Sequence, residues 1–323
     1  MGAAERVPAP TRGDRAHEAF GQRDEAGRAA VRPGQARELL QGAVDMHIHT
    51  HPALFPRPHD DVEVARMARD LGLRAIVVKN HHMGTAARAY YAQKAVPGIQ
   101  VFGGIVLNRY VGGLNPYAVE SEIRYGARIV WMPTVTADNH LRYFGKPGFT
   151  GYGTEFRSVE GITVLGPDGA LVPPVKEILE IVAEANVVLA TAHLTHEEIQ
   201  ALVPAARAAG VRKILVTHAN FELNRIPVAL CKDLVAQGAV IEYCFLPLTP
   251  LWYAHTPKDL MGWIRELGPE NVVLSSDIGN HYNPAPPEAF RIFLETMLTV
   301  GITPQEIVTM AHKNPARLLG LDG

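Results

Sequence analysis

Short apolar runs rich in branched residues alternate with amphipathic stretches from about Gln35 to the end of the chain. The apolar runs have the length of buried strands, and the amphipathic stretches have the spacing of helices. This alternation is typical of parallel strands joined by crossover helices. Eight strands are predicted, at residues 43–49, 75–80, 100–108, 127–135, 187–193, 213–219, 239–246 and 271–278. Eight such units predict an α/β fold of the (β/α)8 TIM-barrel class.

Capping residues support the helices predicted between the strands. Thr195 and Glu198 have the spacing of a capping box, and Thr256 and Thr303 each precede a proline at a first helical position. Glycines follow several predicted helices, where a left-handed residue commonly ends the helix. The helix and strand predictions therefore agree with each other.

Two segments depart from the alternation. Residues 1–34 are rich in Ala, Gly, Arg and Pro and have no lasting hydrophobic period, which predicts a flexible N-terminal extension before a single barrel domain at 35–323. The longest non-helical connection is expected after the fourth strand, from about Thr136 to Pro174. Its GPDG sequence predicts a hairpin turn. We expect this extended loop to form a lid or a wall of a pocket.

The composition is that of a self-sufficient globular domain. With 323 residues, of which 47% are hydrophobic and 20% charged, the chain can bury a substantial core. Lys and Arg number 31 and Asp and Glu number 33, giving a net charge of −2, so nothing predicts binding to nucleic acid or to an anionic membrane. The expected partner is a small-molecule substrate, and a homo-oligomer is compatible with the sequence.

The sequence contains no apolar run near the ~18 residues that a membrane helix needs. The N-terminus also lacks the apolar core of a secretory signal. We therefore expect a cytoplasmic protein.

The first predicted strand ends in two closely spaced histidines. Side chains alternate along a strand, so Asp45, His47 and His49 are expected on one face. A single histidine here would be consistent with an ordinary polar residue at the mouth of a barrel. Two imidazoles at this position can instead bind one divalent ion, and the pair favours a metal site.

Three other predicted strands end in residues that bind metals. His193, His218 and Asp277 each follow an apolar run. The carboxyl ends of barrel strands meet at the rim where active sites of this fold are built. Together with the histidine pair, these residues predict one metal centre at that rim.

At this point the sequence resembles the amidohydrolase superfamily of metal-dependent hydrolases. The resemblance extends over residues 43–321 and rests on His47-Ile-His49, His193, His218, Asp277 and the closing sequence HKNPARLLGL. The wider wording, with VDMHIHTHP and GGIVLNRYVGGLNP, is similar to a poorly characterised branch of that superfamily. The resemblance implies a TIM-barrel enzyme that binds one or two divalent ions, with zinc expected and manganese or iron as alternatives.

The fourth predicted strand departs from the superfamily pattern. Many members carry a carboxylated lysine or a glutamate there, whereas ARIVWMPTV offers neither. Lys79, at the end of the second strand, is an alternative bridging ligand, because burial lowers the pKa of a lysine and favours its reaction with carbon dioxide. A plain ion pair between Lys79 and Asp45 or another rim carboxylate is an equally good interpretation.

Further polar residues are candidates for contact with a substrate. His81 follows the second strand, and His140, Arg142 and Tyr143 lie in the long connection after the fourth. Loops at this end of a barrel commonly carry binding residues, although a solvated position is the simpler expectation for the last three.

The resemblance also implies a mechanism. A bound divalent ion activates water as hydroxide and polarises a carbonyl group. Asp277 would act as general base and then general acid, while His218 or His193 binds metal or stabilises the oxyanion. The predicted function is thus hydrolysis of a cyclic amide, a lactone or a similar carbonyl compound. The alternatives are a metal-dependent decarboxylase of the same superfamily, then a phosphoesterase of the polymerase-and-histidinol-phosphatase type, then a non-catalytic barrel that binds a small molecule.

Overall fold

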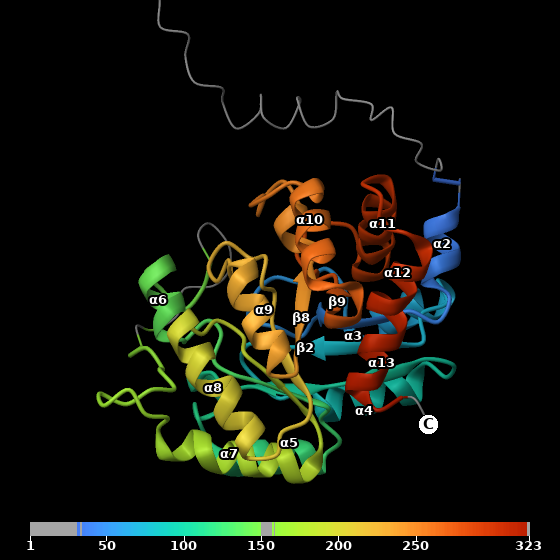
Figure 1. Cartoon of the computed structure of the whole chain (residues 1–323). Helices are drawn as coiled ribbons and strands as arrows, with labels where there is room; N and C mark the ends of the chain where they lie inside the picture. The colour runs from blue at the N-terminus through green and yellow to red at the C-terminus, as the bar shows by residue number, and fades with distance from the viewer. Residues whose placement is uncertain (1–30, 33, 150–156, 158, 322–323) are drawn as a thin grey trace, which may run out of the picture.

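A computed structural model describes residues 31–32, 34–149, 157 and 159–321. The predicted N-terminal extension at 1–34 therefore lies almost entirely outside the described residues. Within them, strands and helices alternate along the chain (Figure 1).

The strands of the described chain correspond to the eight that the sequence predicts. They are β1 (Val44–His49), β2 (Ala75–Lys79), β3 (Gln100–Phe102), β4 (Gly104–Val106), β5 (Ile129–Trp131), β6 (Val188–Ala190), β7 (Ile214–Val216), β8 (Ala239–Cys244) and β9 (Val272–Ser275). The third predicted strand is divided at Gly103 into β3 and β4. A Cβ atom at Gly103 would lie 2.3 Å from the carbonyl oxygen of Thr85, so this close approach of two backbones requires glycine.

All of these strands pair in parallel. β1, β2 and β3 form one sheet, and β4 to β9 form a second sheet in chain order. The two sheets also meet at their other edges, because Ile48 forms a parallel bridge with Ile278 and the Asp277 amide donates to the carbonyl of His47 at 2.8 Å. The first and last strands are thus side by side, and the predicted TIM-barrel class is confirmed.

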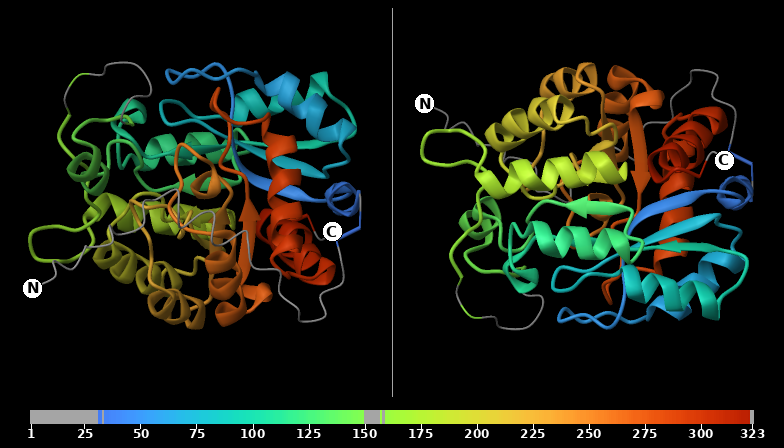
Figure 2. Two further views of the ribbon diagram at one scale, coloured as in Figure 1. Left: turned by 90° about the horizontal axis from the view of Figure 1, so that it is seen from above. Right: turned by 90° about the horizontal axis from the view of Figure 1, so that it is seen from below.

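Helices lie around the outside of the strands in both views of Figure 2. They are α2 (Gln35–Leu40), α3 (Asp61–Asp70), α4 (Ala86–Ala95), α5 (Pro116–Arg124), α6 (Asp138–Phe144), α7 (Pro173–Ala185), α8 (His196–Ala208), α9 (Val228–Ala236), α10 (Pro257–Leu267), α11 (Pro286–Thr299), α12 (Pro304–Val308) and α13 (Asn314–Leu319). Short turns η1 (Arg109–Val111), η2 (Leu246–Leu248), η3 (Pro269–Asn271) and η4 (Thr309–Lys313) connect some of them. The capping boxes that begin at Thr195, Thr256 and Thr303 are present.

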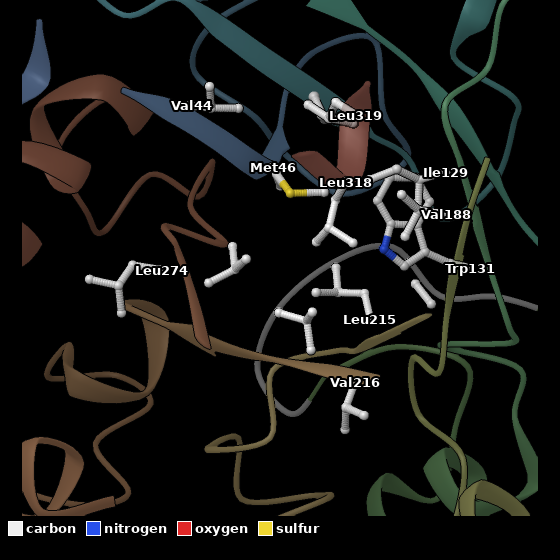
Figure 3. Close-up of a cluster of buried hydrophobic side chains, with 14 of the residues drawn as sticks. Val44, Met46, Ile129, Trp131, Val188, Leu215, Val216, Leu274, Leu318 and Leu319 are labelled. Carbon is white, nitrogen blue, oxygen red and sulfur yellow. The ribbon is translucent and has the colours of Figure 1, made fainter. Parts of the chain in front are cut away.

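A hydrophobic cluster joins the strands to the C-terminal helix. Val44 and Met46 of β1, Trp131 of β5 and Leu215 of β7 are buried in it (Figure 3). The closing helix α13 adds Leu318 and its neighbour from the opposite end of the chain. Burying a side chain of this size stabilises the fold by roughly 1.5–3 kcal/mol, so this cluster is a main source of stability for the barrel.

Two local expectations need correction. The hydrogen-bonded strands β5, β6, β7 and β9 end three or four residues before the predicted ends. After β6, β7 and β9 the backbone turns away where Ala192, His218 and Asp277 take positive φ. The connection after β5 was expected to be non-helical, yet it contains α6, with Asp138 in its first turn and Gly145 as a left-handed end. The predicted hairpin turn is present as a bridge between Leu165 and Leu171.

No helix in the described part of the chain combines the length and apolarity required to span a membrane.

Candidate metal centre

Three donor side chains from opposite ends of the chain converge where β1 meets the segment after β9. Asp277 Oδ1 lies 3.0 Å from His47 Nε2 and 3.1 Å from His49 Nε2. All three residues are buried, and their donor atoms are near enough to one another to hold a single ion. The structure thus brings together residues 228 and more positions apart, as strand ends of one barrel.

The hydrogen bonds of the two histidines show which ring nitrogens carry hydrogen. His49 Nδ1 lies 3.1 Å from the carbonyl oxygen of Lys79, which can only accept, so this nitrogen donates. His47 Nδ1 lies 3.2 Å from Glu242 Oε2 and donates to that carboxylate. In the neutral rings both Nε2 atoms then carry lone pairs that face Asp277. A positive charge is needed where these atoms meet, and it can come from the Lys79 ammonium 3.0 Å from His47 Nε2, from a proton on the His47 ring or from a bound divalent ion.

His218 and His193 lie beside this pair. The ring centroids of His218 and His47 are 5.9 Å apart, and those of His218 and His193 are 5.0 Å apart. Both ring nitrogens of His218 are buried without a hydrogen-bond partner among the described residues. A buried imidazole normally has a partner, so His218 offers a free donor atom to an ion at this point. This orphaned ring and the lone pairs around Asp277 fit a divalent cation with nitrogen and oxygen ligands.

Unusual backbone conformations place two of these residues. His218 has φ of 32° and Asp277 has φ of 54°, both in the left-handed region that costs energy for residues other than glycine. Strain of this kind is concentrated at functional sites. It occurs here at the points where the chain leaves β7 and β9.

Lys79 lies in the same site because β2, which ends at Lys79, pairs with β1. Its backbone is in register with His49, and its Nζ lies 3.0 Å from His47 Nε2. The side chain is only 2% exposed and lies 5.4 Å from the centre of the Trp131 ring. Burial lowers the pKa of Lys79, while the carboxylates of Asp277 and Glu242 oppose that effect. Lys79 therefore reaches the predicted site, in contact with a histidine.

The anticipated partner of Lys79 on β1 has a different role. Asp45 Oδ1 accepts from the amides of His47 and Ser276, at 3.2 and 3.0 Å. Burial raises the pKa of Asp45 to about 7, against these hydrogen bonds. The pairing of β1 with β2 shifts register between Asp45 and Ile48, and the donor atoms grouped with those of the two histidines belong to Asp277 and not to Asp45. Asp45 thus links β1 to the end of β9.

Glu242 of β8 is a site residue that sequence reasoning missed. It is fully buried, receives the His47 ring hydrogen and accepts from the amide of His218 at 3.0 Å. Burial alone would raise its pKa, but His47 and His218 lower the pKa of Glu242 to about 2. One carboxylate therefore orients two of the candidate ligands. The signal was present as a lone acidic residue inside the apolar run AVIEYC.

The electrostatics of the ligands follow from burial and from these carboxylates. Burial, and then the charge of Lys79, lower the pKa of His218 to about 3. Burial lowers the pKa of His49 and of His193 well below the ordinary value. Burial alone would raise the pKa of Asp277, yet His47 and His49 hold it well below its usual range. His47 differs, because burial lowers its pKa but the charges of Asp277 and Glu242 outweigh burial and raise it. Neutral His49, His193 and His218 beside the ionised Asp277 have the protonation states that a metal requires.

A cleft opens beside these residues. Its walls combine polar and aromatic side chains, which are His49, Arg57, Lys79, His81, Phe149, His193, His218, Phe221, Leu246, Trp252, Asp277 and Asn280. Trp252 contacts Phe149 and Phe221, with ring centroids 5.3 and 5.7 Å apart, so the three rings form one wall. The sequence pattern did not single out Arg57 or these two phenylalanines, because they lie in irregular segments.

The predicted substrate-contact residues are divided by the structure. His81 lines the cleft, stacked on His49 with ring centroids 4.9 Å apart. His140 is buried and bonds to His193 rather than lining the cleft. Arg142 and Tyr143 are exposed and line a separate surface hollow with residues of α8, and Arg142 pairs with Asp138.

Comparison with known proteins places the chain in a family. The description "Family of unknown function (DUF6282)" belongs to a family model that matches residues 42–242. The chain belongs to this family. No curated protein matches it significantly. The match includes both histidines of β1, Lys79, His193, His218 and Glu242, and ends before Asp277.

Solved structures show what fold the family has. An amidohydrolase from Pseudomonas aeruginosa is similar with 13% identity and a TM-score of 0.57, covering 90% of this chain and 98% of its own. A putative 2-pyrone-4,6-dicarboxylic acid hydrolase from Pseudomonas putida has 18% identity and a TM-score of 0.54, covering 87% and 98%. A 2,6-dihydroxybenzoate decarboxylase has 12% identity and a TM-score of 0.54, covering 87% and 99%. These likenesses confirm the resemblance to amidohydrolase-superfamily enzymes at the level of the fold.

Proposed function

We propose that this protein is a metal-dependent hydrolase that attacks a compact carbonyl compound. The observation that carries the proposal is the set of lone pairs on His47, His49 and Asp277, which face one point at about hydrogen-bond distance beside the orphaned ring of His218. Such a set of buried donor atoms favours a cation between them. A metal with an open position toward the cleft is what hydrolysis requires.

The residues divide into holding and reacting groups. His47, His49, His193, His218 and Asp277 would hold a divalent ion, with zinc preferred for these ligands. When bound, such an ion supplies Lewis acidity and lowers the pKa of water. Lys79 either adds a positive charge beside His47 or, as a carbamate, bridges two ions. Its buried position and lowered pKa are compatible with both.

Asp277 is proposed as the proton carrier. Its carboxylate borders the cleft and is ionised at neutral pH, because His47 and His49 oppose the effect of burial on its pKa. It can accept a proton from the attacking water and return it to the leaving group. His218, neutral and facing the cleft, is placed to bind the ion or to stabilise the developing oxyanion.

The cleft favours a planar substrate that carries negative charge. Phe149, Phe221 and Trp252 provide a wall against which a flat ring can stack. Arg57 and Lys79 provide positive charge on the lining. A cyclic ester or amide with a carboxylate would match both features, and the pyrone dicarboxylic acid hydrolase of similar fold acts on a compound of that kind by its name.

A decarboxylase is the second candidate, and Arg57 is the observation that favours it. A guanidinium in the cleft can hold the carboxylate of a conjugated acid beside the metal ligands. A decarboxylase is also among the enzymes of similar fold. A phosphoesterase and a non-catalytic binding barrel remain the third and fourth alternatives.

Product analysis tests the proposal. Metal-loaded protein is incubated with a panel of lactones, cyclic amides, carbamates, phosphotriesters and conjugated aromatic acids, and products are identified by mass spectrometry. We expect a ring-opened product whose mass has increased by one water, formed only with metal present. Loss of carbon dioxide would replace the hydrolase with the decarboxylase. Turnover that persists after complete metal removal would contradict both.

A further inference from the structure

His140 connects a candidate metal ligand to the wall of the cleft. This residue of α6 is fully buried, and its Nδ1 lies 2.9 Å from Nδ1 of His193. The two rings stack with centroids 5.0 Å apart and planes at 17°. On its other side, His140 Nε2 lies 3.0 Å from the carbonyl oxygen of Gly148. Gly148 directly precedes Phe149, which lines the cleft.

The positions of the hydrogens follow from the chemistry of the partners. A carbonyl oxygen only accepts, so His140 Nε2 carries a hydrogen and donates it to Gly148. The His140 ring is surrounded by Phe144 and Phe149, with centroids 4.6 and 5.3 Å away, and the described residues place no carboxylate in contact with it. A buried cation without an anionic partner is strongly disfavoured. The ring is therefore neutral, and its Nδ1 carries a lone pair.

That lone pair determines the state of His193. Two nitrogens 2.9 Å apart need one hydrogen between them. Because His140 Nδ1 can only accept, His193 Nδ1 donates. The neutral His193 ring then has its lone pair on Nε2 and would bind an ion through that atom.

We infer that His140 is a positioning residue, which fixes His193 as an Nε2 ligand and ties the Gly148–Phe149 wall of the cleft to the metal centre. Its importance for metal binding rests on the proposed function, whereas the position of the hydrogens does not. One buried ring thus links the loop that would contact substrate with a ligand that would contact the ion. A substitution that keeps the shape of the ring but removes its nitrogens is expected to remove the hydrogen bonds to His193 and to Gly148, and so to weaken both links.

The ring hydrogens are tested first, in metal-free wild-type protein labelled with ¹⁵N-histidine. Long-range ¹H–¹⁵N spectra distinguish protonated ring nitrogens from bare ones, and His193→Gln and His140→Gln variants assign the signals. We expect His193 protonated at Nδ1 and His140 at Nε2. A His193 ring protonated at Nε2, or a doubly protonated His140 at neutral pH, would overturn the inference.

Zinc affinity is the second test, measured by competition with a chromophoric chelator. His140→Phe keeps the ring shape but removes both hydrogen bonds, and we expect zinc to bind about 10-fold to 100-fold more weakly, the usual effect of losing a group that orients a ligand. His140→Gln retains a donor and an acceptor and should recover part of the affinity. Lys146→Ala, on the exposed segment just after α6, is the matched control and should bind as the wild type does.

Zinc binding by His140→Phe within about twofold of wild type would overturn the positioning role. If that variant does not fold, the spectra of the wild-type protein and the affinity of His140→Gln decide the question. A wild-type protein that binds no zinc would instead remove the proposed function, while the spectra would still test the arrangement of hydrogens. The two failures are therefore distinguishable.

Discussion

The two ends of the barrel strands have different roles, one in hydrophobic packing and the other in the candidate metal centre. In β1, Val44 and Met46 are packed in the hydrophobic cluster (Figure 3). The ring nitrogens of His47 and His49 instead lie close to Asp277. The same division occurs at β7, where Leu215 is in the cluster and His218 follows the strand. The apolar ends stabilise the fold, whereas the polar ends bury charged groups and, at His218, a ring with no hydrogen-bond partner among the described residues. We infer that packing at the apolar end offsets the unfavourable free energy of burying the polar groups of the site.

Particular residues account for this unfavourable free energy. Residues other than glycine with positive φ cost on the order of 1–3 kcal/mol each, and His218 and Asp277 have it at the polar end. Burial of Lys79 and Glu242 adds the desolvation of two charged groups. Substitutions at the two ends should therefore separate function from stability.

The largest effect is expected at Asp277. Asp277→Asn keeps the shape and one oxygen but removes the basic carboxylate, so turnover should fall by on the order of 10²-fold to 10⁴-fold, the usual contribution of a general base. Metal content should be largely retained. The measurement is the initial rate with the best substrate of the panel, alongside metal analysis. Turnover near that of wild type would exclude Asp277 as the proton carrier.

A substitution at the apolar end should give the reverse pattern. Leu215 is 1% exposed, and Leu215→Ala should lower the free energy of unfolding by about 2–5 kcal/mol because it leaves a cavity. Zinc affinity of the folded protein should remain close to that of wild type. Urea unfolding and chelator competition measure the two quantities. A loss of zinc affinity as large as that of a ligand variant would show that the two ends are not separable.

Glu242→Gln tests the carboxylate that orients His47. The amide can still accept one hydrogen bond but loses the charge, and we expect zinc affinity to fall about 10-fold to 100-fold. Burial lowers the pKa of the His47 ring, whereas the charges of Asp277 and Glu242 raise it. Removing the charge of Glu242 should therefore lower the pKa of His47 in the metal-free protein. NMR titration of the ring follows that change. An unaltered affinity and an unaltered titration together would assign Glu242 a purely structural role.

The smallest effect on folding is expected at Lys79. Lys79→Met removes the desolvation cost of a buried ammonium but also the positive charge beside Asp277 and Glu242, so the two effects oppose each other and the stability of the metal-free protein should change little. If Lys79 is a carbamate bridge, the variant should lose one equivalent of metal, and intact-protein mass spectrometry of the wild type should show an added carbon dioxide. A plain ammonium with unchanged metal content would leave only an electrostatic role for Lys79.

Sequence patterns predicted those parts of this molecule that depend on local periodicity. The strands and the order of His47, His49, His193, His218 and Asp277 follow from apolar runs and their ends. Glu242 could not be placed in the site by spacing alone, because its contact with His47 spans 195 residues and depends on how the barrel closes. The aromatic wall lies in irregular segments whose paths are set by tertiary contacts. His140 is buried against His193, whereas Arg142, two residues later on α6, is exposed. This difference depends on how the helix packs and could not be predicted from the sequence.

The metal content of the purified protein decides whether the polar end of the barrel is a metal centre. Wild-type protein and His47→Ala are purified without added metal, dialysed against zinc and then against buffer, and analysed by inductively coupled plasma mass spectrometry. We expect one or two tightly held equivalents in the wild type and a loss of most of that metal in the variant, with Leu215→Ala retaining it. A wild-type protein that retains no divalent metal, or a His47→Ala protein that retains as much as wild type, would show that this end of the barrel is not a metal centre.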